Sequence, residues 1–179
     1  MRIISGRLRG KKITAPDNLP VRPTTDFAKT GLFNILSNHL NFSTVSALDL
    51  FTGTGNISYE LISRGVKNVT AVDADKRCIA FVQKIFNDIH AENAEAIQSD
   101  ALEFLEQCSR TFDLIFADPP FNSNPIQDIV EIVFRKKLLT SQGLLIIEHS
   151  SEMQAPKSDN LLETRTYGAV AFSIFVAEK

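Results

Sequence analysis

A run of four residues, Asp118-Pro119-Pro120-Phe121, has the types and the order needed to hold a planar amino group. Two consecutive prolines fix the backbone φ angles and leave carbonyl oxygens without competing N–H donors. A carboxylate and neighbouring carbonyls accept both hydrogens of one NH2 group, and an aromatic ring beside them stacks on a purine, an interaction of roughly 1–3 kcal/mol. The pattern indicates a binding site for a purine amine, with a plain Pro-Pro turn as the alternative.

A glycine-containing loop follows an earlier apolar segment, where residues 49–55 read Asp-Leu-Phe-Thr-Gly-Thr-Gly. Two glycines separated by one residue allow a tight turn and a close approach of the backbone to a ligand. A purely structural turn explains such a loop as well. The third glycine of the dinucleotide GxGxxG pattern is missing, which argues against a nicotinamide-dependent oxidoreductase.

Acidic residues follow the next two apolar segments. Asp73 lies 20 residues after Gly53, and a carboxylate at this separation accepts both hydroxyls of an adenosine ribose. The alternative role is capping of the following helix, for which Asp75 is the better candidate. Two roles stay open for Asp100, which is either an acceptor for an adenine amino group or the N-cap of the helix that begins at Ala101.

Apolar strands alternate with amphipathic helices around these residues. A first helix has its N-cap at Thr24 or Thr25. Strands are predicted at 45–51, 68–72, 94–98, 112–117 and 143–148, helices between them at 56–64, 75–90, 101–108 and 126–137, and an antiparallel pair at 161–167 and 169–177. This alternation predicts a parallel sheet covered on both faces, whose ligands bind at the carboxyl ends of the strands.

The chain of 179 residues has a length and an apolar content, 44%, that are typical of one globular domain. Its formal net charge of -2 is unevenly divided, because residues 1–31 hold seven basic and two acidic residues. Such a basic segment favours contact with nucleic acid, with a solvated basic tail as the alternative. No apolar run approaches the roughly 18 residues of a membrane span and no secretory signal is evident, so we expect a cytoplasmic protein with no membrane partner.

The remaining candidate ligands form no recognisable pattern. Cys78 and Cys108 have neither disulfide nor zinc-site spacing, so we expect packing thiols and no metal. The histidines are scattered, and surface positions or helix ends explain His39, His90 and His149. Glu148 and His149 end a predicted strand, which leaves a place at the rim of the pocket as a lesser option.

The Asp-Pro-Pro-Phe run, the glycine loop and several N-terminal segments together resemble those of the RsmD family. Members of this family are 16S ribosomal RNA guanine-N2 methyltransferases. The Asp-Pro-Pro-Phe run resembles the family's motif for exocyclic amines, and the glycine loop resembles its S-adenosylmethionine loop. The resemblance extends from Arg2 to about Glu148 and includes the segments Arg-Ile-Ile-Ser-Gly at 2–6, Arg-Gly-Lys-Lys-Ile at 9–13, Arg-Pro-Thr-Thr-Asp at 22–26 and Leu-Phe-Asn-Ile-Leu at 32–36. It departs at residues 27–30, where Phe-Ala-Lys-Thr replaces a more basic Arg-Val-Arg-Glu and leaves Lys29 alone.

The resemblance implies an α/β, Rossmann-like class I S-adenosylmethionine-dependent methyltransferase fold. Its sheet would have seven mostly parallel strands with a C-terminal antiparallel hairpin, preceded by a small β-rich extension. Residues 1–24 would be a basic RNA-binding extension and residues 25–179 the methyltransferase domain. The implied cofactor, S-adenosylmethionine, would be bound by Asp49, Phe51, Gly53, Gly55, Asp73, Ala74, Asp100 and Ala101, and the RNA by Arg2, Arg7, Arg9, Lys11, Lys12 and Arg22.

The implied reaction methylates N2 of one guanine in 16S ribosomal RNA, on an assembled or assembling 30S subunit and by a monomer. Asp118 and the Pro119 carbonyl would accept the two amino hydrogens, with Pro120 and Phe121 completing the catalytic site around a flipped base. No metal is required, since positioning supplies most of the acceleration. The motif does not name the base, so methylation of adenine N6 or another amine or amide stays an alternative, as does a catalytically silent RNA-binding protein.

Overall fold

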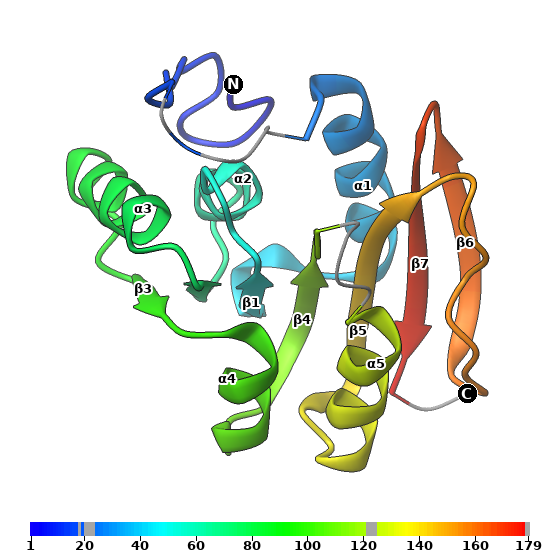
Figure 1. Ribbon diagram of the computed structural model, residues 1–179. Helices are drawn as coiled ribbons and strands as arrows, with labels where there is room; N and C mark the ends of the chain where they lie inside the picture. The colour runs from blue at the N-terminus through cyan, green and yellow to red at the C-terminus, as the bar shows by residue number, and fades with distance from the viewer. Residues whose placement is uncertain (18, 20–23, 121–124, 178–179) are drawn as a thin grey trace.

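A seven-stranded sheet in the order β3-β2-β1-β4-β5-β7-β6 forms the centre of the molecule (Figure 1). The computed structural model describes residues 1–17, 19, 24–120 and 125–177. Its strands are β1 (Ser46–Leu50), β2 (Asn68–Asp73), β3 (Ala94–Gln98), β4 (Phe112–Ala117), β5 (Leu139–Ser150), β6 (Leu161–Tyr167) and β7 (Val170–Val176). The first five pair in parallel, whereas β7 is antiparallel to both β5 and β6. The predicted parallel sheet with a terminal hairpin is confirmed.

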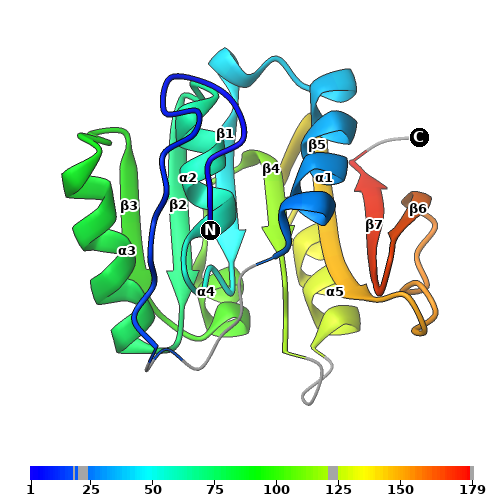
Figure 2. The ribbon, with the colours of Figure 1, turned by 90° about the horizontal axis from the view of Figure 1, so that it is seen from above.

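Helices cover both faces of this sheet (Figure 2). One face carries α1 (Asp26–His39), α2 (Asn56–Ser63) and α3 (Lys76–Asp88), and the other carries α4 (Ala101–Gln107) and α5 (Ile126–Arg135) (Figure 1). Successive strand residues point to opposite faces, so Leu114 joins the core under α1–α3 while Ile115 joins the core under α4 and α5. A short 3-10 turn, η1 (Phe42–Thr44), links α1 to β1. The parallel strands have apolar residues throughout because both of their faces are buried.

Polar side chains set the helix starts where the sequence places them. Thr25 caps α1 by accepting a hydrogen bond from the amide of Ala28 at 3.2 Å, and Asp75 caps α3 through the amide of Arg77. The free thiols Cys78 and Cys108 are buried, as predicted for packing residues. In the part of the chain that the structure describes, no helix is long and apolar enough to span a bilayer.

Strand β5 is longer than predicted, since it spans Leu139–Ser150 instead of 143–148. Residues 140–142 are polar, so the apolar pattern did not predict the beginning of this strand. The register of its pairing with β4 also shifts there, between Phe112 and Leu114. At its other end the strand includes His149, which the sequence placed at a surface or a helix end. That expectation is wrong, because His149 is buried and its Nε2 lies 2.8 Å from the Ser173 hydroxyl.

The N-terminal segment has less β structure than expected. Its described residues make a single antiparallel bridge, between Arg2 and Lys12, and form no named strand. The segment contacts α2 instead, because the Arg7 amide donates to the Ser63 carbonyl at 2.8 Å. Ile3 and Ile13 are buried in the same core as α1–α3, which joins the segment to the body of the protein.

Candidate active site

Three carboxyl side chains lie together at the carboxyl ends of neighbouring strands. Asp49 lies in β1, Asp118 directly follows β4, and Glu148 lies near the end of β5. Ala117 pairs with Ile147, so the next residue of each strand, Asp118 and Glu148, stands side by side on strands about 4.8 Å apart. All three alternate with residues of the α4–α5 core and therefore share the face that carries α1–α3.

Burial makes these carboxyls hard to ionise. Asp49 accepts hydrogen bonds from the hydroxyls of Ser58 at 2.5 Å and Thr52 at 2.7 Å, yet its burial raises its pKa to about 6. Burial, reinforced by the nearby charge of Asp49, raises the pKa of Asp118 to about 7. Burial and then the charge of Asp118 raise the pKa of Glu148 to about 8, although a hydrogen bond from Thr24 opposes this rise. Among the described residues, none of the three carboxyls forms an ion pair.

The glycine loop runs close to this group in a constrained backbone conformation. Phe51, Gly53 and Gly55 have φ angles of 58°, 53° and 78°, in the left-handed region that glycine tolerates best. A Cβ on Gly55 would lie 2.5 Å from the ring of Tyr59, so this position requires glycine. The Tyr59 hydroxyl is buried and has no hydrogen-bond partner among the described atoms. No pattern in the sequence predicted a role for Tyr59 at this site.

Asp73 links the glycine loop to the end of β2. Its Oδ2 accepts the amide of Gly53 at 2.8 Å, and its Oδ1 accepts the amide of Asp75 at 2.8 Å. Each carboxylate oxygen has two acceptor positions, so the side chain keeps capacity for further hydroxyl donors. Capping of α3 belongs to Asp75, as the sequence indicated.

The other residues assigned to a cofactor gather at the ends of β2 and β3. Asp100 caps α4 by accepting the amides of Leu102 and Glu103 at 2.9 and 3.1 Å, which establishes one of its two predicted roles. Ala101 begins α4 and is buried, and Ala74 accepts a hydrogen bond from Gln98 through its carbonyl. Contact of these residues with an adenine stays a prediction.

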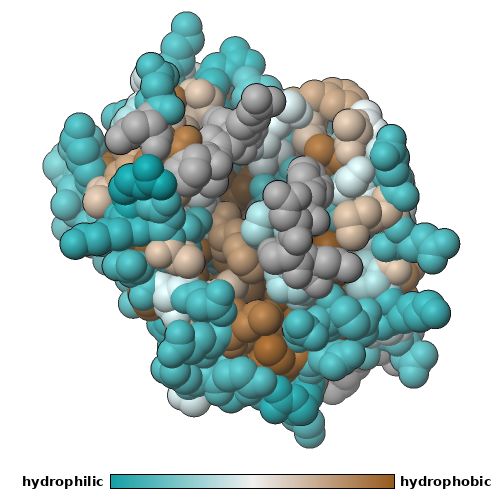
Figure 3. Space-filling view, viewed as in Figure 1, coloured by the Kyte–Doolittle hydropathy of each residue, from teal (hydrophilic) through white to brown (hydrophobic). Residues whose placement is uncertain are grey.

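The Asp-Pro-Pro-Phe run is described only in part. The amide of Asp118 donates to the Leu50 carbonyl at 3.4 Å, which ties the end of β4 to β1. Pro119 is buried and Pro120 is exposed, whereas Phe121 lies outside the described residues. The surface is hollowed near this edge of the sheet, and apolar side chains are exposed in the hollow (Figure 3). The described residues contain no group of three or more His, Cys, Asp or Glu side chains that could hold a metal ion.

The basic residues of the N-terminal segment divide into two groups. Arg2 forms an ion pair with Asp26 at 3.6 Å, and Arg7 donates to the Ile89 carbonyl at the end of α3. The second group is exposed and has no side-chain partner in the described part of the chain; it comprises Arg9, Lys11 and Lys12. Arg22 lies outside the described residues. A groove of about 560 Å³ runs between this segment and the first residues of α1.

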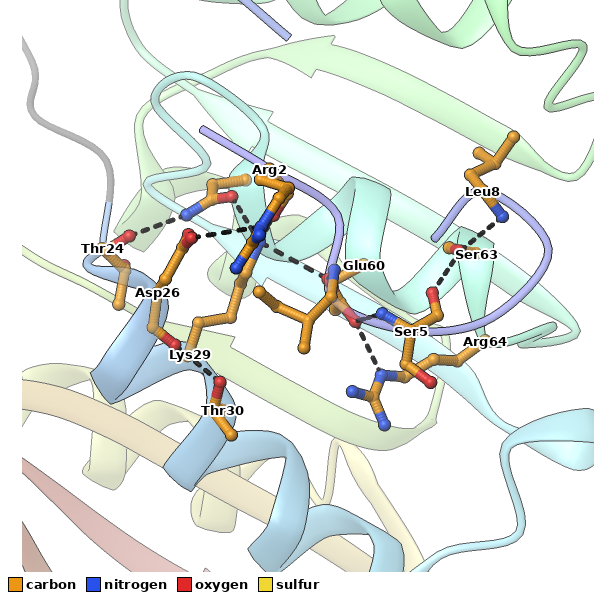
Figure 4. A network of polar contacts seen from close by, with 12 residues as sticks. Arg2, Ser5, Leu8, Thr24, Asp26, Lys29, Thr30, Glu60, Ser63 and Arg64 are labelled. Carbon is orange, nitrogen blue, oxygen red and sulfur yellow. Dashed lines mark hydrogen bonds and ion pairs between the residues drawn. The ribbon is translucent and has the colours of Figure 1, made fainter. Parts of the chain in front are cut away.

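Lys29, the basic residue kept in the departing segment, is not on the surface. Its ammonium is fully buried between α1 and α2, where it contacts Glu60 at 3.4 Å and donates to the carbonyl of Arg2 and the amide oxygen of Asn56 (Figure 4). Burial lowers the pKa of Lys29, and the charge of Glu60 opposes this shift. Glu60 also accepts the amides of Ile4 and Ser5, so the pair fastens the N-terminal segment to the helices.

A chain of hydrogen bonds joins this buried pair to the carboxyl group at the strand ends. Asn56 binds Lys29 through its oxygen and donates through its nitrogen to the Thr24 carbonyl at 2.9 Å. The Thr24 hydroxyl donates in turn to Glu148 at 3.2 Å. From the sequence, a place at the rim of the pocket was only a lesser option for Glu148. Its partner Thr24 is 124 residues away along the chain, so no local pattern indicates the contact.

Proteins of known description resemble this chain over almost its whole length. The family model "Conserved hypothetical protein 95" matches residues 1–176. Ribosomal RNA small subunit methyltransferase D of Haemophilus influenzae is 31% identical over 98% of this chain and 93% of its own length. The Escherichia coli protein of the same name is 29% identical over 99% of this chain and 90% of its own length. The solved Escherichia coli structure described as "Putative methyltransferase yhhF" is 27% identical, with a TM-score of 0.89 over 100% of this chain and 98% of that one.

Proposed function

The chain belongs to the RsmD family of methyltransferases, and from this membership we propose that it methylates N2 of one guanine in 16S ribosomal RNA. The observation that carries the proposal is the position of Asp118, partly buried at the end of β4 beside the glycine loop and followed by two prolines. Open α/β sheets bind their ligands at this edge. The relatives named for ribosomal RNA small subunit methylation favour ribosomal RNA as the substrate class.

S-adenosylmethionine fits the residues of this edge as methyl donor. Asp73 keeps acceptor capacity for two ribose hydroxyls, and the left-handed backbone at Gly53 and Gly55 makes the tight turn that runs beside it. Asp100 and Ala101 would hold the adenine, while Asp49, Phe51 and Ala74 would complete the pocket. When bound, the cofactor supplies an electrophilic methyl group on a sulfonium that leaves as a neutral thioether.

The protein contributes position and a hydrogen-bond acceptor. The amino group of guanine is a weak nucleophile because its lone pair is delocalised into the ring. Asp118 and the carbonyl of Pro119 would accept its two hydrogens and turn the lone pair toward the methyl group. The pKa of Asp118, raised to about 7, leaves this carboxyl able to hold the proton that N2 loses after the transfer.

The exposed basic residues of the N-terminal segment would contact the phosphate backbone. Arg9, Lys11 and Lys12 are free to do so, whereas Arg2 and Arg7 already hold protein groups and would contribute less. Arg22 is kept as a predicted contact from its place in the sequence alone. We place the reaction in the cytoplasm, on an assembled or assembling 30S subunit and by a monomer.

The test uses small ribosomal subunits from a strain that lacks this protein. Purified enzyme and tritiated S-adenosylmethionine should label these subunits, and mass spectrometry of the nucleosides should find N2-methylguanosine. Asp118→Ala should lower the rate by at least 100-fold while calorimetry shows unchanged cofactor affinity, with Asp118→Asn as the isosteric control. Near-wild-type turnover by Asp118→Ala would remove its proposed role, and N6-methyladenosine as the product would establish the alternative substrate.

A further inference from the structure

We propose that Glu148 is a second base-contacting residue, which accepts the N1–H of the target guanine while Asp118 accepts the amine at N2. This inference rests on the proposed function and extends it from the reacting amine to the choice of base. Asp118 and Glu148 occupy equivalent places on neighbouring strands, one residue beyond the paired Ala117 and Ile147. Their side chains therefore leave the sheet on the same face and can reach adjacent positions of one planar ligand.

The surroundings of Glu148 leave its carboxyl in need of a donor. Thr24, at the start of α1, is its hydrogen-bond donor among the described residues, at 3.2 Å. The charged groups that act on it are Asp118 from β4 and Asp49 from β1, and both disfavour its ionisation. Phe172 is opposite it on β7 and offers no polar side-chain group. A ligand with N–H donors would lower the cost of ionising Glu148, because hydrogen bonds stabilise the charged form of a buried carboxyl.

Guanine offers those donors in the required order. Its N1–H and its N2 amine are adjacent, so both point toward neighbouring acceptors on the same edge of the base. Adenine has a lone pair at N1 next to its amine, and this lone pair would face the Glu148 carboxylate unfavourably. A pair of contacts to one base edge is worth about 1–3 kcal/mol, which corresponds to roughly 5- to 150-fold in selectivity.

Two variants of Glu148 separate recognition of the base from a merely structural role. Glu148→Leu removes the acceptor and keeps the side-chain volume, so KM for small subunits from the deletion strain should rise about 10- to 100-fold. Glu148→Gln keeps an oxygen acceptor but does not titrate, so its KM should stay within a few-fold of the wild-type value. Cofactor affinity, measured by calorimetry, should be the same in all three proteins because Glu148 is assigned to the base.

The pH dependence of KM distinguishes recognition of the base from a packing role of Glu148, because a packing role would not make KM depend on pH. The burial of Glu148 and the charges of Asp118 and Asp49 raise its pKa to about 8, so ionised acceptor accumulates as the pH rises. Wild-type KM should therefore fall between pH 6.5 and pH 9, and Glu148→Gln should show a flatter profile.

The outcomes distinguish this inference from the proposed function. N2-methylguanosine as the product, with wild-type KM for Glu148→Leu or with equal pH profiles for wild type and Glu148→Gln, overturns the inference and leaves the proposed function standing. N6-methyladenosine as the product overturns both. Should Glu148→Leu fail to fold, as judged by circular dichroism, the comparison of Glu148→Gln with wild type decides the matter alone.

Discussion

Glu60 and Glu148 are both buried carboxyls, yet their surroundings differ. Glu60 contacts the cations of Lys29 and Arg64 and accepts two backbone amides. Glu148 has the Thr24 hydroxyl and stands beside another carboxyl, Asp118. Buried charge costs several kcal/mol unless partners compensate it. Glu60 with Lys29 and Arg64 forms a compensated region, which stabilises the fold. Glu148 with Asp118 forms an uncompensated region, whose carboxyls lack partners that a ligand can supply.

The two regions meet at the start of α1. Thr24 receives the Asn56 amide from the compensated network and donates to Glu148 at the strand ends. The N-terminal segment supplies the Ile4 and Ser5 amides that Glu60 accepts. Removal of residues 1–24 would thus uncover a buried ion pair, and point substitutions are the cleaner way to examine the basic residues.

The largest loss of stability is expected from breaking the compensated region. Glu60→Ala leaves the Lys29 ammonium buried without its partner, so the free energy of unfolding should fall by roughly 3–5 kcal/mol. Urea denaturation followed by circular dichroism measures this change. Arg64→Ala is the matched control with a smaller loss, because its guanidinium is partly exposed. A loss below about 1 kcal/mol for Glu60→Ala would contradict the contrast between the regions.

The opposite sign is expected in the uncompensated region. Glu148→Gln or Asp118→Asn replaces a carboxyl that burial and like charge disfavour, so the ligand-free protein should gain roughly 1–3 kcal/mol at pH 8. The same urea titration measures the gain. Loss of stability in both variants would show that these carboxyls are compensated after all.

The pH dependence of stability follows from the same carboxyls. The pKa values in the folded protein are raised, to about 6 for Asp49, 7 for Asp118 and 8 for Glu148, above the roughly 4 of an unfolded chain. The folded state then binds more protons than the unfolded state, so stability present at low pH is lost as the pH rises through these values. Thermal unfolding between pH 5 and pH 9 should show a falling Tm, with a shallower fall in the Asp118→Asn, Glu148→Gln double variant.

A smaller effect on stability, with a clear effect on ligand affinity, is expected at the end of β2. Asp73→Ala should weaken binding of S-adenosylmethionine about 10-fold or more, since the ribose hydroxyls lose a charged acceptor. Isothermal titration measures this loss. Asp75→Ala is the matched control, because it removes a helix cap worth about 1 kcal/mol and leaves the proposed ribose ligand in place. Equal affinities in the two variants would exclude Asp73 as that ligand.

The smallest change in stability is expected at the exposed basic residues. Substitution of Arg9, Lys11 and Lys12 by alanine should alter the free energy of unfolding by less than about 0.5 kcal/mol. The slope of log affinity for ribosomal RNA against log salt should become shallower by about 2. Lys137→Ala, at an exposed site after α5 on the other face of the sheet, should leave that slope unchanged. An unchanged slope in the triple variant would remove these residues as phosphate contacts.

Local pattern accounts for most of the fold. The bounds predicted for β3, β4 and β6 agree with those observed, because apolar strands with flanking turn residues are visible in a short window. The β5 strand and the N-terminal segment were predicted less well. Pairing with β4 extends β5 across polar residues, and contact with α2 replaces the strands expected near Arg2 and Lys12.

In the site, too, local pattern predicted some residues, and tertiary contacts decided the position of others. Asp73 and Asp118 stand next to glycine or proline residues whose local conformations are informative, so the sequence marks them directly. Lys29 shows the limit of that approach, since a basic residue in a segment with a resemblance to an RNA-binding region is in fact fully buried against Glu60. Burial is a property of the packed molecule and has no local signature for a lysine.

By itself the sequence determined the alternation of strands and helices, the glycine loop and the acid-proline motif, because each depends on neighbours within a few residues. Tertiary structure alone decided which charges are compensated. Glu60 meets its partners and Glu148 meets Asp118 only when the parallel sheet brings distant strand ends together and α1 closes over them. The cost of a buried charge depends on every element packed around it, and residues 124 positions apart, such as Thr24 and Glu148, fix that cost jointly.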